Sequence, residues 1–121
     1  MTRTMLSLIA AAAAALTLAA GSTTAAPAAA RKLTGTVGPG FTITLKKGTT
    51  KVRRLPRGTY TFVIRDRSGN HNFDLKGPVR KRFTSVSFVG TKTVRLRLKP
   101  GKYTYVCDPH ASAMRGSFRV V

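Results

Sequence analysis

Beyond residue 31, hydrophobic side chains of this chain recur at every second position, which is the repeat of a β-strand and not of a helix. Within residues 59–65, Tyr60, Phe62 and Ile64 fall on one face, and within residues 91–98 apolar residues alternate with lysine and arginine. The pattern predicts strands at residues 35–37, 41–45, 52–55, 59–65, 84–89, 91–98, 103–107 and 118–120.

Glycine and proline separate the predicted strands. Gly38-Pro39-Gly40 and Lys99-Pro100-Gly101 are two of several such turn signals. Apart from a turn expected at residues 111–114, no helical segment is evident after residue 31. Seven or eight short strands at this spacing predict an all-β fold, a Greek-key β-sandwich or barrel.

The first thirty residues have the layout of a secretory signal peptide. Arg3 supplies a positive start, an apolar run covers residues 5–20, and small residues offer cleavage points between residues 25 and 31. An uncleaved anchor is the alternative, but the run is shorter than the roughly 20 residues that span a bilayer. We therefore expect a signal peptide at 1–30 and one exported domain at 31–121. That domain would be periplasmic, in the cell envelope or extracellular, without a membrane span.

The chain is strongly basic, with 22 lysines and arginines against 3 acidic residues and a net charge of +19. Arg3 is the one basic residue before residue 31, so nearly all of this charge belongs to the expected domain. Such a field attracts acidic proteins, anionic polymers, lipid headgroups or nucleic acid. Export argues against nucleic acid. On strands, basic side chains also protect exposed edges, which is the simplest explanation for any one of them.

The expected domain holds one cysteine, two histidines and one methionine: Cys107, His71, His110 and Met114. Two imidazoles, a thiolate and a thioether are the ligands of a blue-copper electron-transfer site. Metal binding would also account for an unpaired cysteine in an exported protein. Zinc is an alternative for a Cys-His-His set. A loop stiffened by Pro109 and ending in methionine favours copper.

Three segments carry a family resemblance: Asn70-His71-Asn72-Phe73, Tyr103-Thr104-Tyr105-Val106-Cys107-Asp108-Pro109-His110 and Met114-Arg115-Gly116-Ser117-Phe118. Together they resemble the cupredoxins, the small blue-copper proteins such as plastocyanin, amicyanin and pseudoazurin. The resemblance covers residues 35–121, and its signature is C-x-P-H with a following Met-x-Gly and an upstream His-Asn.

The resemblance implies that His71, Cys107, His110 and Met114 bind one copper ion. It implies that hydrogen bonds of Asn72 tie the two ligand loops together. Pro109 has no N–H to donate to the thiolate, which tends to raise the redox potential. Three residues separate His110 from Met114, whereas plastocyanin-like loops carry four and amicyanin-like loops two. This spacing leaves the distance of the axial methionine open.

The resemblance further implies a mobile, monomeric one-electron carrier. Electrons would leave through the edge of His110, which small residues, Ala111, Ser112 and Ala113, surround. The basic surface would orient an acidic redox partner. A copper enzyme would need a second centre with more histidines, so we expect no catalysis. Copper buffering or delivery would use the same ligands and stays open, and an anionic-polymer-binding module is a further alternative.

Overall fold

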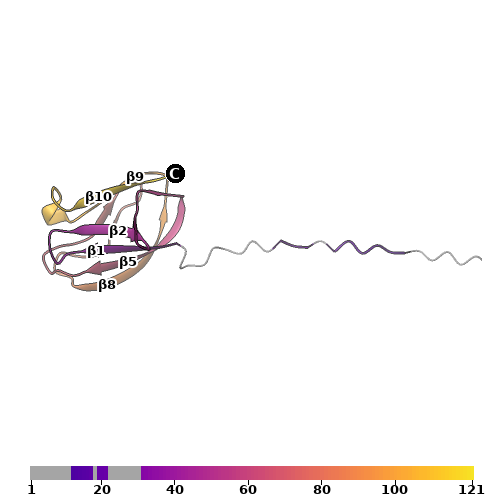
Figure 1. The fold of residues 1–121 in the computed structure, drawn as a ribbon, viewed down its shortest axis with the longest axis horizontal. Coiled ribbons are helices and arrows are strands. Elements are labelled where there is room, and N and C mark those ends of the chain that lie inside the picture. Colours follow the sequence, from indigo (N-terminus) through magenta and orange to yellow (C-terminus); the bar gives the residue numbers. More distant parts are fainter. Residues whose placement is uncertain (1–11, 18, 22–30) are drawn as a thin grey trace, which may run out of the picture.

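The computed structural model describes residues 12–17, 19–21 and 31–121. The signal peptide predicted at residues 1–30 therefore lies largely outside the described residues and stays a prediction. Within the described ranges, no helix has the length and apolar character needed to span a membrane. Residues 31–121 fold as a β-sandwich (Figure 1).

Two five-stranded sheets make up the sandwich, in the orders β3-β2-β1-β5-β8 and β4-β10-β9-β6-β7. The strands of the first sheet are β1 (Lys32–Val37), β2 (Ile43–Lys47), β3 (Thr50–Lys51), β5 (Gly58–Asp66) and β8 (Gly90–Leu98). Those of the second are β4 (Arg54–Leu55), β6 (Asp74–Lys76), β7 (Lys81–Arg82), β9 (Gly101–Val106) and β10 (Arg115–Val120). Both sheets are mixed, because β1 pairs in parallel with β5 and β10 in parallel with β4.

The predicted all-β sandwich is confirmed, but its strands differ in detail. The described residues form ten strands instead of seven or eight, since two-residue strands such as β3 and β7 show no alternation that a sequence could reveal. The strand predicted at residues 84–89 is wrong. There the N–H of Phe88 donates to the carbonyl of Ser85 at 3.1 Å, which closes a turn and leaves Val86 and Val89 exposed.

The core between the sheets includes side chains that the period-two pattern placed inward. Tyr60, Phe62 and Ile64 are at most 3% exposed. Aromatic rings stack across the second sheet: Tyr103 and Phe118 lie 5.2 Å apart between ring centroids at an interplanar angle of 8°. The alternation therefore identified the buried face of the long strands correctly.

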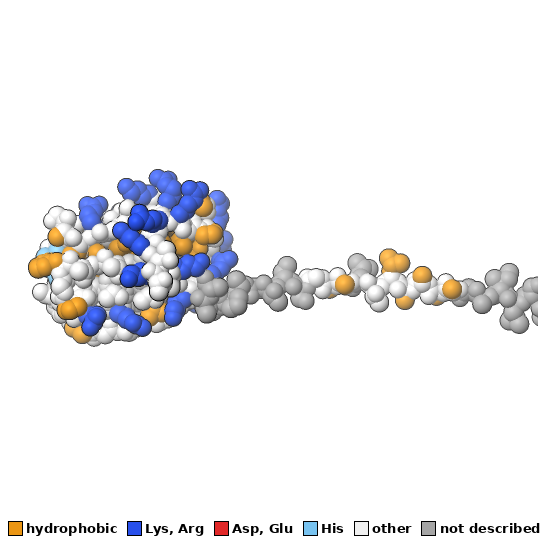
Figure 2. All heavy atoms as spheres, in the orientation of Figure 1, with side chains coloured by type: hydrophobic (Ala, Val, Ile, Leu, Met, Phe, Trp, Pro, Cys, Tyr) orange, Lys and Arg blue, Asp and Glu red, His pale blue; other side chains and the backbone are white. Residues whose placement is uncertain are grey.

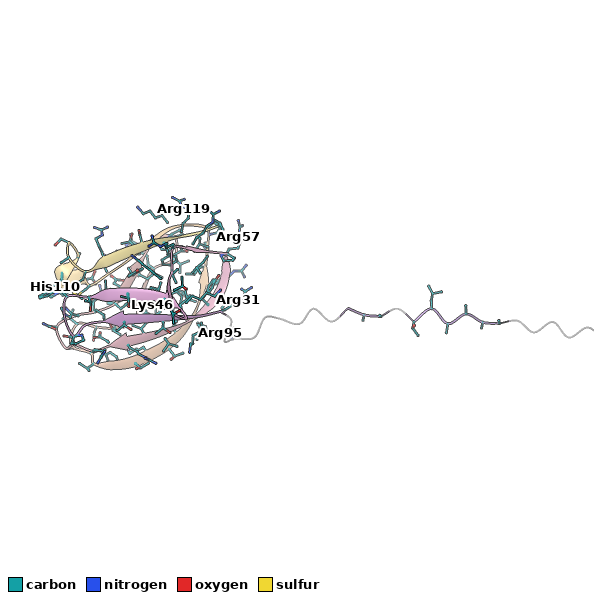
Figure 3. The ribbon with its side chains drawn as sticks, viewed as in Figure 1. Arg31, Lys46, Arg57, Arg95, His110 and Arg119 are labelled. Atoms are coloured by element: carbon teal, nitrogen blue, oxygen red, sulfur yellow. The ribbon has the colours of Figure 1, made fainter. Side chains whose placement is uncertain are left out.

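The strand directions define two ends of the sandwich. β1, β5 and β9 all run toward the end that carries His110, and β2, β8 and β10 start there. We call this end, where the expected copper ligand His110 lies, the copper end, and the opposite one the distal end. Figure 3 shows His110 at the first, and Arg31, Arg57 and Arg119 at the second.

Candidate metal centre

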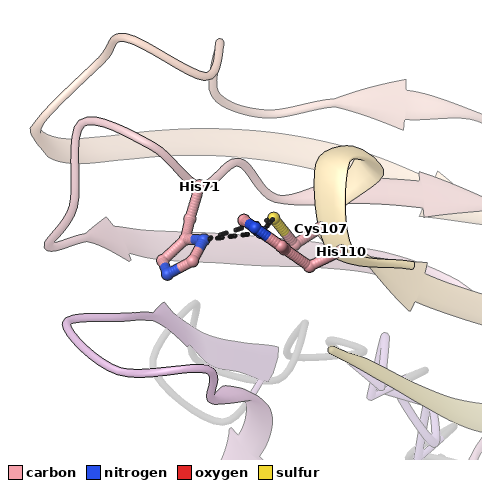
Figure 4. A group of neighbouring side chains, drawn as sticks. All are labelled: His71, Cys107 and His110. Carbon is pink, nitrogen blue, oxygen red and sulfur yellow. Dashed lines mark hydrogen bonds between the residues drawn. The ribbon is translucent and has the colours of Figure 1, made fainter. Parts of the chain in front are cut away.

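His71, Cys107 and His110 point their ligand atoms at one another at one end of the sandwich (Figure 4). The Sγ of Cys107 lies 3.6 Å from the Nδ1 of His71 and 3.6 Å from the Nδ1 of His110. The two Nδ1 atoms lie 3.1 Å apart. The three atoms thus form a nearly regular triangle, although His71 precedes Cys107 by a long stretch of chain.

The size of this triangle fits a metal ion at its centre. Metal–nitrogen bonds of about 2.0 Å and metal–sulfur bonds of about 2.3 Å in a trigonal plane would separate the nitrogens by about 3.5 Å and each nitrogen from sulfur by about 3.7 Å. The observed separations are close to these values. Two imidazole nitrogens that face each other also repel unless a cation or proton lies between them. The donor set, two imidazoles and a thiolate, is that of a copper site.

The Cys107–Met114 loop is folded by its own backbone hydrogen bonds. Residues Asp108–His110 form a 3-10 turn, in which the N–H of His110 donates to the carbonyl of Cys107 at 3.0 Å. The N–H of Met114 donates to the carbonyl of His110 at 2.8 Å, and the N–H of Cys107 donates to the carbonyl of Met114 at 3.1 Å. Pro109 at the start of the turn suits it, because its missing N–H is not needed there.

The loop brings the last predicted ligand, Met114, into the interior beside Cys107. Its side chain is 1% exposed and belongs to the same buried cluster as Cys107, which is 0% exposed. Three residues between His110 and Met114 are therefore enough to return the chain to the core. The arrangement fits a single type 1 copper site, which His71, Cys107 and His110 would hold with Met114 nearby.

Asn72 connects the two loops that supply the ligands. Its Oδ1 accepts a hydrogen bond from the backbone N–H of Asp108 at 2.7 Å, and its Nδ2 donates to the Oδ2 of Asp108 at 2.8 Å. Asn72 is 1% exposed, so its end of both bonds is shielded from water. The contact is the one that the family resemblance implied for Asn72, and it fixes the Cys107 loop against the His71 loop.

Charged side chains that the sequence did not predict at the site lie around Asp108. Lys76 Nζ lies 3.3 Å from Asp108 Oδ1 and 4.0 Å from Asp74 Oδ2, and Arg82 Nε lies 3.7 Å from Asp108 Oδ2. Burial raises the pKa of Asp74, and the neighbouring Asp108 raises it further. Burial also opposes ionisation of Asp108, but hydrogen bonds from Asn72, Asp74 and Lys76 outweigh it and lower the pKa of Asp108. Of the two carboxyl groups, Asp108 is thus the one that ionises at the lower pH.

Phe41 covers the two histidines and was not predicted as a site residue. Its ring meets His71 edge-on at 5.6 Å and His110 at 4.9 Å between centroids, while 65% of its surface stays exposed. The sequence placed it at the start of a strand, but the structure begins β2 two residues later and leaves Phe41 in the turn after β1. Phe41 directly follows the turn residues Gly38-Pro39-Gly40, and this is the one feature of the sequence that indicates a position in a turn.

Small and apolar residues surround His110 at the surface. Pro109, Ala111 and Ala113 are exposed, and His110 itself is partly exposed, whereas His71 is 2% exposed. Phe41 extends this apolar surface on one side of the ring. Figure 2 shows the same end of the molecule with hydrophobic side chains beside the histidine and lysines and arginines concentrated elsewhere.

A β-sandwich that presents two imidazoles and one thiolate in a triangle at one end defines a type 1 copper protein. The family model for copper-binding proteins of the plastocyanin/azurin family matches residues 42–121. The chain belongs to this family, which confirms the cupredoxin resemblance and identifies the cofactor as copper.

Solved structures share the fold. Reduced rusticyanin is 23% identical with a TM-score of 0.55, over 74% of this chain and 78% of that one. A second rusticyanin structure is 21% identical with a TM-score of 0.55, over 74% of this chain and 76% of that one. A copper-containing nitrite reductase from Thermus scotoductus SA-01 is 25% identical with a TM-score of 0.50, over 74% of this chain but 22% of the reductase. None of the curated proteins matches the chain.

Proposed function

We propose that this protein is an exported, mobile one-electron carrier and that His71, Cys107, His110 and Met114 hold its copper. Bound copper supplies the Cu(I)/Cu(II) couple. The proposal rests on one observation above all: of the three triangle residues, Cys107 and His71 are buried while His110 reaches the surface. A redox centre so placed is shielded from solvent and still has one ligand edge in reach of a partner.

The chain's residues supply what fast electron transfer needs, a site whose geometry changes little between the two oxidation states. Asn72 and the 3-10 turn hold the Cys107 loop in place independently of the metal. Pro109 cannot donate a hydrogen bond to the thiolate, which favours a raised potential. The exposed Ala111 and Ala113 let another protein approach the His110 ring closely.

The partner that we propose is an acidic redox protein. The net charge of +19 attracts it from a distance. The basic residues, however, are concentrated away from His110, so apolar contact around Pro109, Ala111 and Phe41 would orient the partner at short range. We infer that the carrier acts as a monomer and catalyses no reaction by itself, since both histidines of the chain are already in this one site.

The test is to load the purified protein with Cu(II) and record its visible and electron paramagnetic resonance spectra. We expect an intense blue colour from thiolate-to-copper charge transfer, and Cys107→Ala abolishes it. A colourless copper protein would contradict the proposal. Repeated reduction and reoxidation in the presence of a copper chelator then separates the two copper functions. A carrier keeps its copper through many cycles, whereas a buffering or delivery protein loses it.

A further inference from the structure

The positive charge of the sandwich lies mainly at its distal end. The basic residues of the strand ends and turns there are all exposed: Arg31, Lys32, Lys46, Lys47, Lys51, Arg53, Arg54, Arg57, Arg97, Lys99, Lys102 and Arg119. The register puts these residues beside the distal turns: Lys47 pairs with Thr50 and Arg97 with Thr59, and Arg119 lies between Lys102 and Arg54. In Figure 2 lysines and arginines crowd this end.

The three acidic residues of the chain lie toward the opposite end. Asp66 is the last residue of β5, Asp74 pairs with Val106, and Asp108 follows Cys107. Each ion pair found among the described residues uses Asp74 or Asp108. Since no aspartate or glutamate side chain lies at the distal end, its many cations repel one another. An external anion bound there would relieve that repulsion.

Two surface hollows at the distal end are lined by cations, one on each sheet. The first, of about 270 Å³, is lined by Arg53, Lys102 and Arg119 together with Ser117 and Phe118. The second, of about 280 Å³, is lined by Arg57, Arg97 and Lys99 together with Gly58, Leu98 and Pro100. Neither hollow has an acidic residue in its lining. Most of these cations are arginines, whose planar fork binds the paired oxygens of phosphate in a bidentate way.

We propose that the distal end binds a flexible, linear polyanion with repeating phosphate groups. A flexible chain can pass from the hollow on one sheet to the hollow on the other, whereas a flat bilayer would contact one plane. The two most exposed large apolar side chains of the sandwich, Phe41 and Val89, lie at the copper end and not where a membrane would dock. The polymer would hold the protein by one end while His110, at the other, stays accessible to a redox partner.

The proposal can be tested by titrating the purified protein with long-chain polyphosphate over a range of salt concentrations. The first variant, Arg53→Gln/Lys102→Gln/Arg119→Gln, removes the three positive charges of the first hollow. The second variant, Arg57→Gln/Arg97→Gln/Lys99→Gln, removes the three positive charges of the second hollow. Each variant should bind polyphosphate at least about tenfold more weakly at low salt. The plot of log K against log salt should become less steep by about 2, because each lost phosphate contact lowers the magnitude of its slope by about 0.7.

The matched control is Arg65→Gln/Arg67→Gln/Lys92→Gln, which removes the same charge from the copper half of β5, β8 and the loop after β5. It should change the slope by less than about 0.7. An equal loss in the control would overturn the proposal, since binding would then follow net charge without a defined surface. Two hollow variants keep the test valid if one fails to fold.

Two further arms decide the occupant and its independence from copper. The affinity for phosphatidylglycerol vesicles should differ between the hollow variants and the control far less than the affinity for polyphosphate does. If the hollow variants lose vesicle binding but keep polyphosphate binding, the surface is a membrane site and the proposal fails. Because the distal end is remote from Cys107, the copper-free protein should bind polyphosphate as the loaded protein does. A failed blue-copper spectrum would therefore leave this test intact.

Discussion

Asn72 and Asp108 form two hydrogen bonds with each other, at 2.7 and 2.8 Å, and these bonds close a ring between separate loops of the molecule. One loop carries His71 and the other Cys107 and His110. Asn72 itself is 1% exposed, so its loss leaves the N–H of Asp108 without its partner, while the Asp108 carboxylate keeps Lys76 and Arg82 beside it. The two loops that carry His71, Cys107 and His110 are therefore held together by a contact in which a metal takes no part.

Asn72→Ala should lower the free energy of unfolding of the copper-free protein by about 1–3 kcal/mol, the cost of leaving buried polar groups unpaired. Urea unfolding measures it. Asn70→Ala, two residues away at an exposed position, is the control and should change stability little. Equal stability of the two variants would contradict the structural role of Asn72.

Met114→Leu should keep the blue colour and raise the redox potential. The His71, Cys107 and His110 ligands that give the colour remain, while loss of the weak thioether donor destabilises Cu(II) more than Cu(I). Cyclic voltammetry and the visible spectrum measure the two effects. An unchanged potential would show that the Met114 sulfur does not contact the copper.

Phe41→Ala should speed the loss of copper to a chelator, because the ring covers both histidines and limits the approach of water. Its effect on stability should be below about 1 kcal/mol, since the ring is mostly exposed. Val89→Ala, another exposed apolar position, is the control. If both variants release copper at the rate of the wild type, Phe41 does not protect the site.

Gly116→Ala should destabilise the protein by about 1–3 kcal/mol or more. A Cβ at this position would lie 2.2 Å from the Oη of Tyr105, whose ring packs against Phe73 in the core. Gly40→Ala is the matched control, because a Cβ there meets nothing within 4 Å. Thermal unfolding of the two variants makes the comparison, and similar melting temperatures would contradict the packing explanation.

Asp66→Asn should stabilise the copper-free protein at neutral pH. Asp66 is 2% exposed, and burial raises its pKa above the usual 3.8, although hydrogen bonds from Thr84 and Ser68 partly offset this. The folded protein then holds the proton more tightly than the unfolded chain, so this group costs stability as the pH rises through its folded-state pKa. Urea unfolding from pH 3 to pH 7 should show the advantage of the variant growing with pH. An advantage that is constant or shrinks would contradict the raised pKa.

Alternation and ligand chemistry were readable from the sequence because both depend on the types of residue at short spacings. Tyr60, Phe62 and Ile64 are buried as their period of two predicted. Cys107, His110 and Met114 were recognisable within a single short loop. The strand predicted at residues 84–89 is wrong, because the chain closes a turn there and leaves Val86 and Val89 exposed.

The sequence by itself determined the all-β class, the set of candidate copper ligands and the total charge, all of which are local or additive properties. Only the tertiary structure decided where distant residues meet. Strand pairing brought Phe41 onto His71 and His110 and joined Asn72 to Asp108. It also placed the acidic residues toward the copper end and most of the basic ones toward the distal end. Such contacts depend on register and sheet packing across many residues, which no short stretch of sequence specifies.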